Sequence, residues 1–184
     1  MNPHAIITLA DGRQMRIELY LDKAPITAGN FIRLCTEQFY DGLIFHRVVK
    51  DYVIQSGSKT GSCQGRDEGF TITGEFEANG HPTGLLHDRG VISMARGKEF
   101  DSASTQFFIV HQEQNTQKLN GKFAAFGRLV GDESYHVLDY IASVDTRPPE
   151  EENRPLVPIV INSIVIEGMD ATLQKEPQGG SAYA

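Results

Sequence analysis

Eight short segments with the pattern of β-strands, against only two with the pattern of helices, constrain the fold of this chain more than any other feature. Residues 15–20 show the pattern best, because apolar and polar side chains alternate there and one face of the strand would be buried. The other segments are residues 6–9, 43–48, 52–55, 91–95, 106–111, 123–130 and 159–166. Strands that do not alternate with helices favour an antiparallel sheet over a doubly wound one. Eight strands can also close into a barrel that its own side chains fill.

The two helical segments are marked by their spacing and their boundaries. The first follows Pro25, which suits a first helical turn because its missing N–H would be unpaired there anyway. Its apolar or small residues recur at helical spacing, at Ala28, Phe31, Ile32, Cys35 and Phe39. The second follows Gly131-Asp132 and has Tyr135, Leu138, Ile141 and Ala142 on one side.

Composition limits the class of protein and its partners. A chain of 184 residues with 40% hydrophobic side chains can form one domain with a core, which we place at residues 1–168. The net charge of −7 disfavours binding to nucleic acid or to membrane surfaces. No segment approaches the roughly 18 consecutive apolar residues that span a bilayer. Residues 169–184 lack apolar periodicity, and we expect them to form a flexible C-terminal tail.

Motifs for metal or cofactor chemistry are missing from the sequence. The six histidines are scattered without an HxxxH pair, and neither Cys35 nor Cys63 completes a zinc spacing. We therefore expect no metal and no cofactor. Two unpaired cysteines and an N-terminus without a signal-peptide pattern favour a cytoplasmic protein. Nothing resembles a heptad repeat, so a monomer is the default.

One segment carries an arginine among apolar residues. Arg47 lies in Phe45-His46-Arg47-Val48-Val49, and Gln55-Ser56-Gly57 follows. Arginine is rarely buried without a partner, so the guanidinium either extends from the sheet toward a surface carboxylate or lies on the wall of an apolar groove. The residues of this segment alone leave both interpretations open.

Five ordered blocks resemble the signatures of cyclophilin-type peptidyl-prolyl isomerases, and together they cover about residues 5–167. One runs from Phe45-His46-Arg47-Val48-Val49 through Gln55-Ser56-Gly57 and contains both Arg47 and Gln55. The others are Ala24-Pro25-Ile26-Thr27-Ala28-Gly29-Asn30-Phe31, Gly90-Val91-Ile92-Ser93-Met94-Ala95-Arg96, Ser104-Thr105-Gln106-Phe107-Phe108-Ile109 and Leu119-Asn120-Gly121-Lys122-Phe123-Ala124-Ala125-Phe126-Gly127. The resemblance implies a closed eight-stranded antiparallel barrel with a helix over each end. It also implies rotation about Xaa-Pro bonds in proline-containing peptides and protein clients, as assistance to folding.

The resemblance also implies a role for ten residues. Arg47 matches the catalytic arginine, and Gln55 matches a polar residue beside it. Substrate binding falls to residues that match the proline pocket, its polar lining and the segment whose backbone pairs with the peptide: Tyr52, Val53, Ala95, Arg96, Gln106, Phe108, Leu119 and Phe123.

Four positions depart from the common family pattern. Tyr52 replaces Phe, and Phe123 replaces His or Tyr, so both remain aromatic. Arg96 replaces an Asn common in eukaryotic members. Lys118 stands where cyclosporin-sensitive members carry Trp, which puts cyclosporin binding in doubt.

Two other functions compete with the isomerase. A proline-recognition or chaperone module would bind the same segments with little turnover, and the altered rim at Lys118 and Arg96 is compatible with it. A small-molecule carrier would need a hollow barrel, whereas the large residues on the predicted strands favour a filled one.

Overall fold

The computed structural model describes residues 1–64 and 68–169 and shows a mainly β protein with two α-helices. One antiparallel sheet contains all eight strands, in the order β3-β4-β6-β5-β7-β2-β1-β8. The strands are β1 His4–Leu9, β2 Gln14–Leu19, β3 Arg47–Val49, β4 Val53–Ser56, β5 Val91–Met94, β6 Phe107–Val110, β7 Ala125–Val130 and β8 Ile161–Glu167. The predicted tail at 169–184 lies outside the described residues, apart from Met169.

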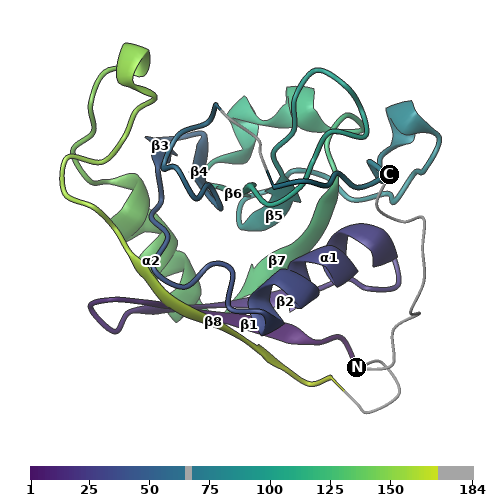
Figure 1. Cartoon of the computed structure of the whole chain (residues 1–184), viewed down its shortest axis with the longest axis horizontal. Coiled ribbons are helices and arrows are strands. Elements are labelled where there is room, and N and C mark those ends of the chain that lie inside the picture. The colour runs from purple at the N-terminus through teal and green to yellow at the C-terminus, as the bar shows by residue number, and fades with distance from the viewer. Residues whose placement is uncertain (65–67, 170–184) are drawn as a thin grey trace.

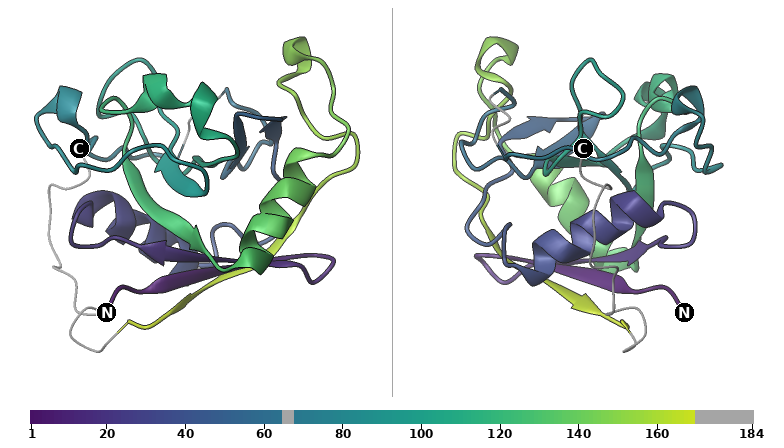
Figure 2. Two further views of the ribbon diagram at one scale, coloured as in Figure 1. Left: turned by 180° about the vertical axis from the view of Figure 1, so that it is seen from behind. Right: turned by 45° about the vertical axis from the view of Figure 1, so that its right-hand side comes forward.

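The sheet curls strongly, and the helices α1 (Pro25–Thr36) and α2 (Asp132–Ala142) lie against it (Figures 1 and 2). Strands β3 and β8 are its two ends. Between them, the N–H of Phe45 donates to the carbonyl of Ile159 at 3.0 Å, and the N–H of Ile161 donates to the carbonyl of Leu43 at 2.8 Å. The residues just before β3 therefore bond to the residues around the start of β8.

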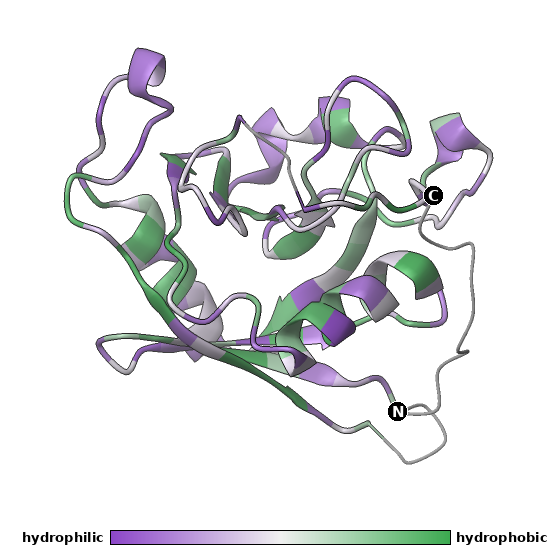
Figure 3. Cartoon of the chain, viewed as in Figure 1, coloured by the Kyte–Doolittle hydropathy of each residue, from purple (hydrophilic) through white to green (hydrophobic). Residues whose placement is uncertain are grey.

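A core of aromatic and aliphatic side chains fills the space that the sheet and helices enclose. Figure 3 shows apolar residues along the strands and on both helices. Phe31 of α1 lies at its centre, with ring centroids 5.4 Å from Tyr40, 5.5 Å from Phe107 and 5.2 Å from Phe126. These four side chains are fully buried. Side chains fill the interior, and this argues against the small-molecule carrier, which would need a hollow barrel.

The N-terminus of α1 is capped by a residue from a distant loop. No side chain at Ala24 caps the helix. Instead, the buried carboxylate of Glu75 accepts the N–H groups of Ile26 at 3.3 Å and Thr27 at 2.6 Å, and also the Thr27 hydroxyl. A carboxylate is favourable here because the first N–H groups of a helix lack partners within it.

Two predicted boundaries were wrong. The helical spacing through Phe39 predicts an end near Asp41-Gly42, but helix α1 ends at Thr36, because Gln38 adopts a left-handed conformation with φ of 59°. The N–H of Phe39 then donates back to the carbonyl of Leu34, which is the bond of a helix C-cap. The strand expected at 43–48 is confined to β3, because residues 42–45 bond to 159–161 instead of continuing the β3–β4 ladder.

Candidate functional site

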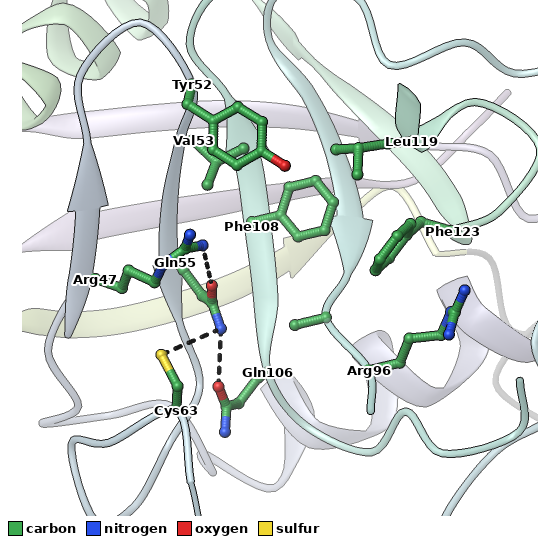
Figure 4. A pocket seen from close by; sticks show the side chains of 11 residues that line it. Arg47, Tyr52, Val53, Gln55, Cys63, Arg96, Gln106, Phe108, Leu119 and Phe123 are labelled. Carbon is green, nitrogen blue, oxygen red and sulfur yellow. Dashed lines mark hydrogen bonds between the residues drawn. The ribbon is translucent and has the colours of Figure 1, made fainter. Parts of the chain in front are cut away.

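A groove of about 290 Å³ opens on the outer face of the sheet, over β4, β5 and β6. Its floor is a second apolar cluster, separate from the core, formed by Val53, Val91, Phe108, Val110, Leu119 and Ala125. Phe108 is at the centre of this floor (Figure 4) and is 5% exposed. Successive side chains of a strand point to opposite faces, so Phe107 enters the core while Phe108 enters the groove.

Aromatic rings hold Phe108 from two directions. The Phe123 ring meets it edge-on, with centroids 6.0 Å apart and an interplanar angle of 76°. The buried His87 ring stacks on it at 5.9 Å and 21°. The floor is consequently a fixed apolar surface of the size that one small ring would cover.

A line of polar side chains forms one wall of the groove. Arg47 on β3 lies opposite Gln55 on β4, and Gln55 lies opposite Phe108 on β6. Arg47 Nη1 donates to Gln55 Oε1 at 3.1 Å, and Gln55 Nε2 donates to Gln106 Oε1 at 3.0 Å. Because arginine can only donate, the Gln55 carbonyl must face Arg47 and its amide nitrogen must face Gln106. Gln55 thus fixes both neighbours.

A close approach between two backbone segments brings the glutamines together. Gly57 follows β4 with φ of +98°, and a Cβ at this position would stand 2.4 Å from the carbonyl oxygen of Thr105. Only glycine fits here, because both the conformation and the space exclude a side chain. The residue after Thr105 is Gln106, so this contact sets its distance from Gln55.

Arg96 forms the opposite side of the groove. Its guanidinium carbon lies 4.5 Å from the Phe123 ring centroid, 5.0 Å from that of Phe76 and 5.2 Å from that of Phe100. Its N–H groups donate to the backbone carbonyls of Lys122, at 2.6 and 3.0 Å, and of Gly97 at 2.9 Å. These contacts fix the position of the positive charge.

Two buried histidines support the site from behind. Burial lowers the pKa of His87 to about 4, because desolvation disfavours the charged ring, and the hydrogen bond to Asn120 opposes this only in part. His87 Nε2 also lies 2.8 Å from Ser93 Oγ. Burial likewise lowers the pKa of His46 to about 4. Neither ring nitrogen of His46 has a partner of standard hydrogen-bond geometry among the described residues, although the Gln106 side chain next to it favours the charged form. Both rings are therefore neutral at pH 7.

All ten residues that the sequence singled out line this one groove. Cys63 also lines the groove, 4.0 Å from Gln55 Nε2. No sequence signal marks it, because it lies in a loop with no metal or nucleophile spacing. No sequence signal marks His87 as a support for Phe108 either, because its stacking on that ring joins segments about 20 residues apart. Within residues 1–64 and 68–169, no cluster of His, Cys, Asp and Glu is arranged to hold a metal, and no helix is long and apolar enough to cross a bilayer.

The fold and the groove together define a class: an antiparallel β protein with an apolar pocket beside a hydrogen-bonded arginine. The family model described as "Cyclophilin type peptidyl-prolyl cis-trans isomerase/CLD" matches residues 4–166. Peptidyl-prolyl cis-trans isomerase B of Bacillus subtilis is 43% identical over 121 residues, which are 66% of this chain and 79% of that protein. Peptidyl-prolyl isomerase CWC27 of Cryptococcus neoformans is 37% identical over 90% of this chain, but the match covers only 32% of that protein.

A solved structure supports the same family. The crystal structure of a cyclophilin type peptidyl-prolyl cis-trans isomerase of Cryptosporidium parvum, in the presence of the dipeptide Ala-Pro, superposes with a TM-score of 0.77 at 27% identity. The superposition covers 90% of this chain and 99% of the Cryptosporidium chain. The chain belongs to the cyclophilin-type family of peptidyl-prolyl cis-trans isomerases. Its activity is isomerisation of Xaa-Pro peptide bonds, so the predicted enzyme class is confirmed and the low-turnover recognition module is not needed.

Proposed function

We propose that the groove over β4, β5 and β6 is the active site and that Arg47 is its catalytic residue. The observation that carries this is the pairing of an arginine, oriented by Gln55, with a rigid apolar floor at Phe108. Proline has an apolar ring next to the bond that must rotate, so a site for it needs both features side by side.

The chemistry requires only selective stabilisation of one geometry. An amide C–N bond rotates over a barrier of roughly 18–20 kcal/mol, because resonance gives it partial double-bond character. In the twisted transition state this resonance is lost, and the prolyl nitrogen gains a lone pair that accepts a hydrogen bond. The planar amide offers no such acceptor. A donor aimed at that nitrogen therefore lowers the barrier without favouring either ground state.

Arg47 suits this task because a guanidinium stays protonated and holds several donors in one plane. One of its nitrogens is engaged by Gln55, which makes Gln55 a positioning residue. In our proposal Phe108, Val53, Leu119 and Tyr52 hold the pyrrolidine ring, and Phe123 completes the pocket. Their burial excludes water, and this strengthens the hydrogen bond from Arg47.

The peptide backbone would lie along the segment at Ala95 and Arg96. The N–H of Ala95 already donates to the carbonyl of Gln106 at 3.0 Å. A hydrogen-bonded residue of an antiparallel pair directs both its N–H and its carbonyl at the same partner, so the backbone of the next residue, Arg96, would face the peptide. The Ala-Pro dipeptide named with the Cryptosporidium structure supports a proline-containing ligand for this groove.

The test is cis–trans exchange of a short Xaa-Pro peptide, measured by NMR with catalytic amounts of the wild type and of Arg47→Ala. Loss of one preorganised donor typically costs about 10²- to 10³-fold, and we expect a loss of this size in kcat/KM. Arg13→Ala, at an exposed hairpin far from the groove, is the control and should keep wild-type activity. Full activity of a folded Arg47→Ala would refute the assignment.

Several finer properties belong to the same proposal. The bonds between residues 42–45 and 159–161 support closure of the sheet into a barrel. We propose a monomeric, cytoplasmic enzyme that assists the folding of protein clients. We also propose that it binds neither nucleic acid nor membranes, because its net charge is −7. Lys118 at the rim supports weak cyclosporin binding, and calorimetric titration with cyclosporin would test it.

A further inference from the structure

The active groove is positively charged although the chain is acidic. Arg47 and Arg96 lie on opposite sides of the pocket in Figure 4, and no Asp or Glu is among the described residues that line it. A third cation lies at the rim, because Lys118 precedes the wall residue Leu119 and its Nζ is 5.1 Å from the centroid of the Tyr52 ring. Net charge of the whole chain is −7, so this concentration of cations is local.

Two of these charges have no carboxylate partner within residues 1–64 and 68–169. Arg47 donates to the neutral amide of Gln55, and Lys118 is exposed beside the neutral Tyr52 ring. The ion pairs of the described residues involve neither of them. Glu152, the carboxylate next to the lining residue Cys63, accepts the N–H of Cys63 and the hydroxyl of Ser62.

The local charge dominates what a bound peptide experiences. At physiological ionic strength the screening length is about 8 Å, so distant surface carboxylates act weakly on a peptide in the groove. Each residue of an extended peptide advances the chain by at most about 3.3–3.6 Å. Leu119, the neighbour of Lys118, packs in the same cluster as Phe108, so with a proline on Phe108 the side chains of the next few residues would lie near the rim at Lys118.

We propose that the groove selects Xaa-Pro segments with an Asp or Glu within three residues of the proline, and that Lys118 is the residue that sets this preference. The inference rests on the proposed active site and adds its substrate class. Arg47 remains the catalytic group, whereas Lys118 contacts the substrate outside the bond that rotates. A lysine near the proline is disfavoured for the same electrostatic reason.

The experiment uses peptides with both ends capped, so that only the side chains carry charge. In each peptide one position from three before to three after the proline is Ala, Glu or Lys. NMR exchange gives kcat/KM for each peptide with the wild type, Lys118→Met and Lys118→Glu. Lys23→Met is the matched control, since it removes one exposed lysine before α1, far from the groove.

We expect the Glu peptide to exceed the Lys peptide by about fivefold in at least one position, as for an exposed ion pair. The ratio should fall toward one in about 0.5 M salt, because the charges are then screened. It should fall below about twofold in Lys118→Met, invert in Lys118→Glu and stay unchanged in Lys23→Met.

Two negative outcomes are distinct. If the wild type accelerates the Ala peptide but treats the Glu and Lys peptides alike at every position, the preference is refuted and the active site stands. If the Ala peptide is not accelerated, the proposed active site itself fails. An undiminished ratio in Lys118→Met would remove Lys118 as the determinant.

Discussion

Phe107 and Phe108 are neighbours on β6, yet they belong to different parts of the molecule. Phe107 is fully buried among Phe31, Tyr40 and Phe45 in the core, with ring centroids 5.3–6.4 Å from the last two. Among the described residues, Phe108 has His87 and Phe123 as ring partners, and it faces the groove. One peptide bond separates a residue that holds the fold together from a residue that meets the substrate. Truncation of Phe107 should therefore act on the core, whereas truncation of Phe108 also changes the groove.

The largest effect should come from Phe107, the ring in the core. Phe107→Ala removes a fully buried aromatic side chain and leaves a cavity, which typically lowers the free energy of unfolding by about 3–5 kcal/mol. Urea denaturation would measure it. A loss below about 1 kcal/mol would mean that the core collapses around the gap, which would contradict the close ring contacts described above.

Loss of Phe108, the ring in the groove, should act mainly on catalysis. Phe108→Ala deletes the floor of the pocket, and losing the burial of one ring-sized apolar contact corresponds to about 10- to 100-fold in kcat/KM. NMR exchange of an Ala-Pro peptide would measure the change. The separation of roles would be wrong if this variant lost as much stability as Phe107→Ala while keeping its activity.

The two buried histidines should make the fold sensitive to acid. Each has a pKa of about 4 in the folded chain against an ordinary 6.5. The unfolded chain therefore takes up protons first as the pH falls, and stability drops below pH 6.5 while it stays level above that pH. Between pH 6.5 and 5 the free energy of unfolding should decrease by about 1.5 kcal/mol for each histidine.

Urea denaturation at pH 7.5, 6.5 and 5.0 tests this sensitivity. Hydrogen bonds from the Gly74 N–H and the Asn79 side chain lower the pKa of Asp101. Burial opposes the shift at Asp139, but hydrogen bonds and charges from Arg89 and His111 outweigh it and lower the pKa of that carboxyl group. Their effect appears only below about pH 4, so it does not interfere. His87→Gln should reduce the slope by about half. Equal stability at pH 7.5 and 5.0 would contradict the neutral state of both rings.

The smallest effect concerns the cap on α1, which contacts neither Phe107 nor Phe108. Glu75→Gln keeps the shape but weakens the bonds to Ile26 and Thr27, and lost caps typically cost about 1 kcal/mol. Glu77→Gln, on an exposed residue two positions away, serves as the control in the same denaturation series. Equal values for both variants would show that the contact contributes nothing.

The sequence predicted the strands, both helices and the ten groove residues, because alternation, Pro25 and the family blocks are local signals. It did not predict the contacts that join distant segments. Glu75 lies 48 residues from the helix it caps, and Cys63 reaches the groove through a loop with no periodicity. Residues 43–46 looked like a strand, but their partners at 159–161 decide how they pair. Such choices depend on three-dimensional packing that no local pattern encodes.

The pairing of β1 with β8 has a consequence for how the protein is made. His4 faces Glu167 across that ladder, so nearly the whole chain separates the two partners. Contacts of such long range slow folding, since a large loop must close before they form. During synthesis β1 must wait until residues 161–167 have left the ribosome, and until then its edge stays open to wrong partners. This isomerase thus depends, for its own sheet, on almost the last part of its domain to be translated.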